Sequence, residues 1–137
     1  MFMSSVTPTE IGARAEAAVA SALVRAGKSV FLPVFGVNTR VDLIYEGDTG
    51  LVRVQCKTSR IVGDVLMFRT SSNTKNLPRA YGDEVDEFGV YSPAKNAVYL
   101  VPALGLPTRA CHLRFTPRLN GQRNGVRWAA DFLLGPP

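Results

Sequence analysis

The sequence predicts a single α/β domain, residues 1–137, with a mixed β-sheet of about five to seven strands flanked by an N-terminal helix and a short C-terminal helix. Three observations predict this fold. An alanine-rich stretch with helical spacing opens the chain, short β-branched runs separated by Gly, Pro and Asn fill the middle, and an apolar segment closes it. With 46% hydrophobic and 20% charged residues, the composition is that of a globular domain and excludes a disordered chain.

Residues 7–26 have the pattern of a helix that packs against a sheet. Thr7 can cap the helix, Pro8 suits its first position, and Glu10 follows the cap by three residues, as a capping box requires. Gly27 is the expected C-terminal cap. The many small side chains imply a close approach to the sheet. The predicted core-facing stripe consists of Ile11, Ala15, Ala18, Val19, Ala22, Leu23 and Ala26.

The remaining elements are predicted from alternation and from turn residues. Pro33 interrupts residues 29–35, which indicates an edge strand. Residues 40–59 predict a hairpin, because β-branched runs flank the turn at 46–50. The acidic residues 83–87 lack the spacing of a calcium loop and predict a solvated turn. Other predicted elements are a strand at 65–70, a polar loop at 71–76, a hairpin of 88–91 with 97–101, an edge strand at 111–115 and a short helix at 128–134.

The predicted hairpin carries polar side chains that suit a hydrolytic site. Gln55 and Lys57 alternate with apolar residues on its second strand, so an amide and a cation lie roughly 7 Å apart on one face. Asp42 projects from the first strand, opposite to its apolar neighbours. A carboxylate, an amide oxygen and a lysine on one sheet face are typical of metal-assisted hydrolysis. The same alternation is also typical of a solvated sheet face, and the pattern leaves both interpretations open.

Glu16 is the second indication of a site. It lies at the edge of the apolar helix stripe, and unlike Glu10 it has no capping role. A carboxylate beside a packed face is costly unless it is paired or bound to a cation. Glu16 therefore becomes a candidate to complete the site on the hairpin. The alternative is that it reaches solvent or pairs with a surface arginine such as Arg40.

The net charge of +5 and the pI near 9.6 favour a polyanionic partner such as nucleic acid. Hydroxyls, amides and cations mix in the 71–76 loop and beside it, and such groups bind phosphate oxygens without reading bases. Cys56 and Cys111 fit no metal-ligand spacing, so we expect reduced thiols in a cytoplasmic protein. No apolar run is long enough to span a membrane, and the lone His112 is expected to be structural.

These residues carry a resemblance to a known family. Gly-Ala-Arg-Ala-Glu at 12–16, Val-Asp-Leu at 41–43 and Val-Gln-Cys-Lys-Thr at 54–58 resemble the PD-(D/E)XK nuclease superfamily. The chain is most similar to the small group I intron homing endonucleases, in which a glutamine replaces the acidic residue before x-Lys. The similarity continues at 70–72, 86–91, 98–102 and 125–129, and so covers most of the chain.

The resemblance implies a restriction-endonuclease-like core and a metal-dependent endonuclease that hydrolyses phosphodiester bonds in double-stranded DNA. Asp42, Gln55 and the backbone carbonyl of Cys56 would bind Mg²⁺, or Mn²⁺ in its place, with Glu16 reaching it directly or through a water. Lys57 would orient or deprotonate the attacking water. Cutting both strands implies a homodimer or homotetramer, with an interface near 88–91 or in the C-terminal segment. The expected DNA contacts are Arg40, Thr58, Ser59, Arg60, Arg69, Ser71, Ser72, Lys75 and Arg79.

Gln55 is the departure that changes the chemistry, because an amide oxygen can bind Mg²⁺ but adds no negative charge. This favours one metal ion over two and leaves open a catalytically silent nucleic-acid-binding module. Holliday-junction resolvases and repair nucleases share the same core and stay open as alternatives. The alternative from a different functional class is a protein-interaction domain whose basic charge is incidental. If Glu16 points away from the hairpin, the enzyme interpretation weakens.

Overall fold

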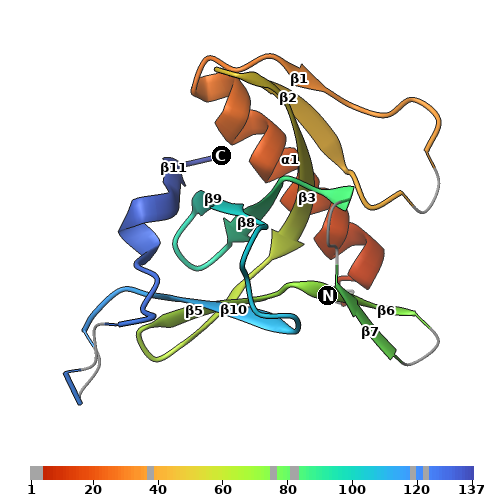
Figure 1. Ribbon diagram of the computed structural model, residues 1–137. Helices are drawn as coiled ribbons and strands as arrows, with labels where there is room; N and C mark the ends of the chain where they lie inside the picture. The colour runs from red at the N-terminus through yellow and green to blue at the C-terminus, as the bar shows by residue number, and fades with distance from the viewer. Residues whose placement is uncertain (1–4, 37–38, 75–76, 81–83, 118–119, 122–123) are drawn as a thin grey trace, which may run out of the picture.

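The computed structural model describes residues 5–36, 39–74, 77–80, 84–117, 120–121 and 124–137 (Figure 1). The elements are α1 (Pro8–Arg25), β1 (Val30–Phe31), β2 (Leu43–Gly47), β3 (Gly50–Thr58), β4 (Arg60–Val62), β5 (Val65–Arg69), β6 (Ser71–Thr74), β7 (Leu77–Ala80), β8 (Glu87–Ser92), β9 (Ala97–Pro102), β10 (Ala110–Arg114), the 3-10 helix η2 (Ala129–Phe132) and β11 (Leu133–Gly135). No helix among the described residues is long and apolar enough to cross a membrane.

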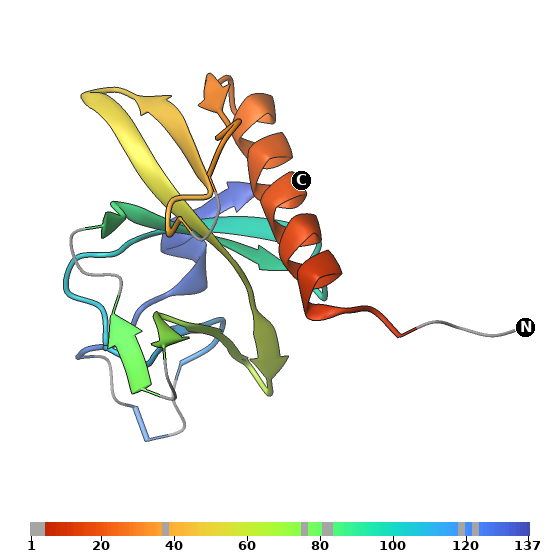
Figure 2. The same cartoon turned by 90° about the vertical axis from the view of Figure 1, so that its right-hand side faces the viewer.

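The main sheet has six strands in the order β1-β2-β3-β8-β9-β11, which confirms the predicted α/β class with a mixed sheet. Within it, β3 and β8 run parallel and every other neighbouring pair is antiparallel. A three-stranded sheet, β10-β5-β4, and the β6-β7 hairpin were not predicted as separate sheets. In Figure 2 the helix lies along one side of the main sheet and the smaller sheets lie away from it.

The helix begins and ends as its sequence predicts. Thr7 Oγ1 accepts from Glu10 N at 3.2 Å, and Glu10 Oε2 accepts from Thr7 N at 2.9 Å, so the capping box is complete. Gly27 has φ +83°, and Lys28 N donates to Leu23 O at 3.0 Å. The buried stripe is Ala15, Ala18, Val19, Ala22 and Leu23. Ile11 and Ala26 are exposed, so their predicted burial was wrong: both lie at helix ends that extend beyond the sheet.

Gly89 on β8 allows α1 to approach the main sheet closely. A Cβ at this position would stand 2.6 Å from Val19 Cγ1 and 3.1 Å from Val54 Cγ1. Valine is stiff at χ1 and the contact is fully buried, so neither neighbour can move away easily. The small residues of the helix and Gly89 together set the helix against β3 and β8.

We expect Gly89→Ala to lower the free energy of unfolding by about 1–3 kcal/mol, because it overpacks this contact. Gly12→Ala is the matched control, since Gly12 is helical and its Cβ would meet nothing within 4 Å. It should raise stability by up to about 1 kcal/mol. Urea unfolding of both variants measures the two changes. Equal effects of the two substitutions would contradict the close packing at Gly89.

The opposite face of the main sheet holds the larger core, where it meets the β10-β5-β4 sheet. Phe88 and Val90 on β8 point here, and Phe68 on β5 stacks against Phe88 with ring centroids 5.6 Å apart. Phe88 and Val90 are 2% and 0% exposed, so the expected oligomer interface around 88–91 is wrong for these residues. Their side chains fill the core and leave no apolar surface there for a partner.

Three further predictions need correction. Residues 71–74 form strand β6, paired with β7, where a loop was expected. The C-terminal segment forms η2 and then β11 on the edge of the main sheet, where only a helix was expected. Three of the acidic residues do not form a merely solvated turn, because they have partners elsewhere in the chain, and Asp83 lies outside the described residues. These contacts are Asp86 with Arg53 at 3.1 Å, Glu84 with Arg40 at 3.0 Å, and Glu87 accepting from the Tyr45 hydroxyl.

Candidate active site

Asp42 lies where β2 separates from β3. Asp42 N donates to Val54 O at 2.9 Å, continuing the ladder by one residue beyond the start of β2. The next donor on β3, Cys56 N, has its partner in the Asp42 carboxylate, with Oδ2 at 2.8 Å. The Asp42 side chain thus accepts the hydrogen bond that a backbone carbonyl would accept if β2 extended farther along β3. This charge-assisted hydrogen bond fixes the carboxylate at the open edge of the hairpin.

Gln55 faces Asp42 across the hairpin. Leu43 pairs with Val54, and continuing this antiparallel register by one residue sets Asp42 opposite Gln55 on the same face of the sheet. Gln55 Oε1 is buried and has no hydrogen-bond partner among the described residues. A buried oxygen left without a partner costs about 1–3 kcal/mol. An acceptor of this kind beside a carboxylate suits a bound cation.

Glu16 reaches the same place from α1. Burial raises the pKa of Asp42 from 3.8 to about 6, and charge repulsion and hydrogen bonding with Glu16 raise it too, whereas the Cys56 N–H and Lys57 lower it. A cation bound between two neighbouring carboxyl groups would relieve this repulsion. The enzyme interpretation required Glu16 to point toward the hairpin, and its interaction with Asp42 meets this condition. Its alternative partner, Arg40, is paired with Glu84.

Lys57, two residues beyond Gln55 on β3, lies close enough to Asp42 for their charges to interact. Burial lowers its pKa from 10.5 to about 8, and the charges of Arg69 and Arg40 also lower it, while Asp42 raises it. A lysine with such a pKa has a substantial neutral fraction near pH 8 and can accept a proton. The buried Cys56 thiol, whose pKa burial raises strongly, stays protonated and inert between these groups.

The donors gathered here fit a hard divalent cation. Two carboxylates and one amide oxygen are the ligand types that Mg²⁺ and Mn²⁺ prefer. Within the described residues no three His, Cys, Asp or Glu side chains form a metal-binding group, so a cation bound here would need a third oxygen of another kind. The partnerless Oε1 of Gln55 meets that need. Mg²⁺ and the backbone carbonyl of Cys56 as its further ligand stay predictions.

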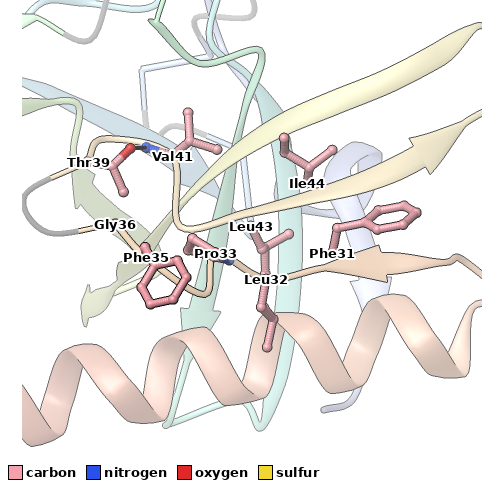
Figure 3. A pocket seen from close by; sticks show the side chains of 9 residues that line it. All are labelled: Phe31, Leu32, Pro33, Phe35, Gly36, Thr39, Val41, Leu43 and Ile44. Atoms are coloured by element: carbon pink, nitrogen blue, oxygen red, sulfur yellow. Dashed lines mark hydrogen bonds between the residues drawn. The ribbon is translucent and has the colours of Figure 1, made fainter.

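The site opens into a cleft of about 410 Å³ that Glu16 and Asp42 line together with the loop between β1 and β2. Figure 3 shows residues of this loop, with Thr39 bonded to the Val41 N–H, together with the apolar side chains around them. They line a second hollow of about 280 Å³, and Phe35 is 96% exposed. The sequence did not predict these side chains beside the site, although the apolar run around Pro33 was an available signal.

The expected DNA contacts fall into three groups. Thr58, Arg60 and Arg69 are exposed beyond the site. Ser59 and Ser71 are 7% and 2% exposed, and Ser59 Oγ donates to Tyr91 O at 2.9 Å, so burial argues against direct DNA contact by either serine. The rest are constrained or only partly described: Arg40 is paired with Glu84, Ser72 and Arg79 face each other in the backbone register of β6 and β7, and Lys75 lies outside the described residues.

Two comparisons with known proteins found a match. The sequence model of the PD-(D/E)XK endonucleases matches residues 6–135. Among solved structures, the chain is similar to the bacterial homing endonuclease I-Ssp6803I, with a TM-score of 0.67 and 18% identity over 95% of this chain and 88% of that one. At this identity the likeness shows the fold alone. A search of curated proteins found no match.

Proposed function

The chain belongs to the PD-(D/E)XK endonuclease family, and we propose that it hydrolyses phosphodiester bonds in double-stranded DNA with a divalent cation, Mg²⁺ or Mn²⁺, held at Asp42. One observation carries the proposal. Glu16 and Lys57, from separate elements, both interact with the Asp42 carboxylate, and the register sets the partnerless Gln55 oxygen opposite it. A merely solvated sheet face would leave Asp42, Gln55 and Lys57 fully in water, whereas all three are half-buried.

In the proposed mechanism some residues would bind the cation and another would take part in proton transfer. Asp42, Gln55 and Glu16 would hold the cation, with the Cys56 carbonyl assisting. When bound, Mg²⁺ would polarise the scissile phosphate and stabilise its developing charge. Lys57 would orient the attacking water and, when neutral, accept a proton from it at Nζ. With two carboxylates and a neutral amide, the donor set favours one cation over two.

Cleavage of a duplex library that carries a randomised segment tests the proposal. A library is needed because a homing-like enzyme cuts only its own sequence. We expect new ends with Mg²⁺ or Mn²⁺ and none with EDTA. Equal cleavage in EDTA would contradict a metal-dependent site. Binding of the library without cleavage under any of these metals would instead favour a catalytically silent binding module.

We also propose that the chain acts as a homodimer or homotetramer in the cytoplasm. One site cuts one strand, so a double-strand break needs two copies related by a two-fold axis. Both cysteines are free, which fits a reducing compartment.

Light scattering should give a mass that is two or four times 14.8 kDa. The protein should be measured alone and with uncleaved DNA in Ca²⁺, which separates intrinsic assembly from assembly on DNA. A single chain in both conditions, together with double-strand cleavage, would contradict the symmetric arrangement. A tagged and an untagged chain, mixed and co-purified, provide an independent check of self-association.

A further inference from the structure

The outward face of the β10-β5-β4 sheet carries a regular array of basic side chains. In the antiparallel register, Arg60, Met67 and His112 form one row across the three strands. The next row on this face, one pair of residues farther along β5 and β10, brings Arg69 beside Ala110. Arg114 lies in the row on the other side, opposite Val65. Arg60, Arg69 and His112 are exposed, and Met67 is half-buried between them.

The alternation of the strands makes this face distinct from the core. Leu66, Phe68, Cys111 and Leu113 are each 0–1% exposed and point inward, so their neighbours in sequence must point outward. None of the residues in β4, β5 and β10 is acidic. Asp64, in the turn between β4 and β5, accepts from Thr116 Oγ1 at 3.1 Å. The basic side chains of this face are of the kind that complements a polyanion.

This face continues directly from the candidate active site. Lys57 is separated from Arg60 by only two residues, and Arg69 lies close enough to Lys57 for its charge to act on the amine. A hollow of about 380 Å³ is lined by Thr58, Arg60, Met67 and Arg69. A second, also about 380 Å³, is lined by His112, Arg114 and Arg127 on the other side of Met67. DNA bound at Asp42 would extend over both.

We propose that the outward face of the β4, β5 and β10 sheet reads base sequence in the major groove of double-stranded DNA, with Arg60, Met67 and His112 contacting base edges. The inference rests on the proposed function and names its specificity surface. The major groove, about 12 Å wide, admits paired β-strands about 4.8 Å apart. Arginine reads guanine, an apolar side chain contacts the thymine methyl, and an imidazole can donate to or accept from base edges.

The sequence predicts Arg60 and Arg69 as DNA contacts, but neither their place on one sheet face nor a role for His112. Residues 111–115 are predicted as a short edge strand, and nothing local indicates that β4 lies beside β5 with their arginines on one face. The alternation of Ala110, His112 and Arg114 with Cys111 and Leu113 was the available signal. Only the register joins Arg60 and His112 across β5.

Selection of bound sequences from a random duplex library tests the proposal, with Ca²⁺ replacing Mg²⁺ so that binding is read without cleavage. Wild type should enrich a defined motif. Arg60→Ala, Met67→Ala and His112→Ala should each lower discrimination at one or two positions by about tenfold and leave the other positions unchanged. Arg25→Ala, at the end of α1 on the other side of the main sheet, is the matched control and should preserve motif and affinity.

Several outcomes would overturn the proposal. They are the absence of any enriched motif, an unchanged motif in all three variants, and an equal loss of affinity over all sequences, which would indicate phosphate contacts only. Circular dichroism should show that the variants keep the fold. Failure of the proposed function is distinguishable: a protein that never cleaves but shows these motif changes still reads DNA with this face. A protein that cleaves DNA while its variants keep the wild-type motif does not read DNA with this face.

Discussion

Asp42→Asn should lower the rate of DNA cleavage by about 1000-fold or more and should also stabilise the metal-free protein. The loss follows because Asp42 is the carboxylate on which Glu16, Lys57 and the Cys56 N–H converge. Removing its charge takes several kcal/mol from cation binding and transition-state stabilisation, and each 1.36 kcal/mol is a factor of ten. The asparagine oxygen can still accept from Cys56 N, so the local backbone should be retained.

The gain in stability follows from the raised pKa. Asp42 has a pKa of about 6 in the folded chain against 3.8 for the ordinary group, so the folded state binds its proton more tightly. Stability should therefore fall as pH rises from about 4 to about 6 and stay lower above it. Allowing for partial solvent screening, the asparagine variant should be more stable by about 1–2 kcal/mol at pH 7.5 and nearly equal at pH 4.

Urea unfolding in EDTA at the two pH values measures this difference, and cleavage of the library measures the activity. Asp48→Asn makes the same chemical change on the turn of the same hairpin, where the side chain is 97% exposed. It should alter neither property. Full cleavage by Asp42→Asn would exclude Asp42 as a metal ligand. A wild-type pH dependence of its stability would exclude Asp42 as the buried titrating group.

Gln55→Met should weaken cation binding and cleavage by about 100-fold while raising metal-free stability by about 1 kcal/mol. The cause is the buried Oε1, which has no partner among the described residues. Methionine keeps a similar length but lacks a hard oxygen, so both the unsatisfied acceptor and the ligand disappear. Gln55→Glu is the contrasting variant. It adds a third carboxylate beside Asp42 and Glu16, so it should destabilise the metal-free protein and raise the pKa of Asp42 further.

Thermal unfolding with and without Mg²⁺ separates these effects. Wild type should gain stability with Mg²⁺, Gln55→Glu should gain more, and Gln55→Met should gain little. The same gain in all three proteins would show that Gln55 is not a ligand. In that case the Gln55 oxygen would have no role in cation binding, and Asp42 and Glu16 would be the side-chain ligands.

Local patterns explain what the sequence could predict. The capping box, the Gly27 cap and the hairpin that carries Asp42 and Gln55 depend on residues close together in the chain, and all three are present. Placing Glu16 near Asp42 needed only the helical period and the cost of a carboxylate beside a packed face. The sequence therefore allowed the interaction between Glu16 and Asp42 to be inferred. It could not give the raised pKa of Asp42, because that depends on how tightly the hairpin and the helix bury the carboxyl group.

Long-range contacts explain what the sequence could not predict. The acidic residues of 83–87 resemble a solvated turn, because their partners Arg53, Arg40 and Tyr45 lie more than thirty residues away. Ser-Ser-Asn-Thr at 71–74 lacks apolar alternation, and only pairing with β7 makes it a strand. The last apolar residues form β11 because the edge of β9 is available to them. Burial of Gln55 Oε1 likewise depends on neighbours that no local pattern reveals.

Replacing Lys57 tests the proposed chemistry independently of metal binding. Wild type and Lys57→Ala should be incubated with the duplex library in Mg²⁺ and, in parallel, assayed for binding in Ca²⁺. We expect cleavage by wild type alone and DNA binding by both, because Lys57 acts on the attacking water. Lys95→Ala, an exposed lysine over the Phe115 ring, should cleave like wild type. Equal cleavage rates for Lys57→Ala and wild type would contradict the mechanism.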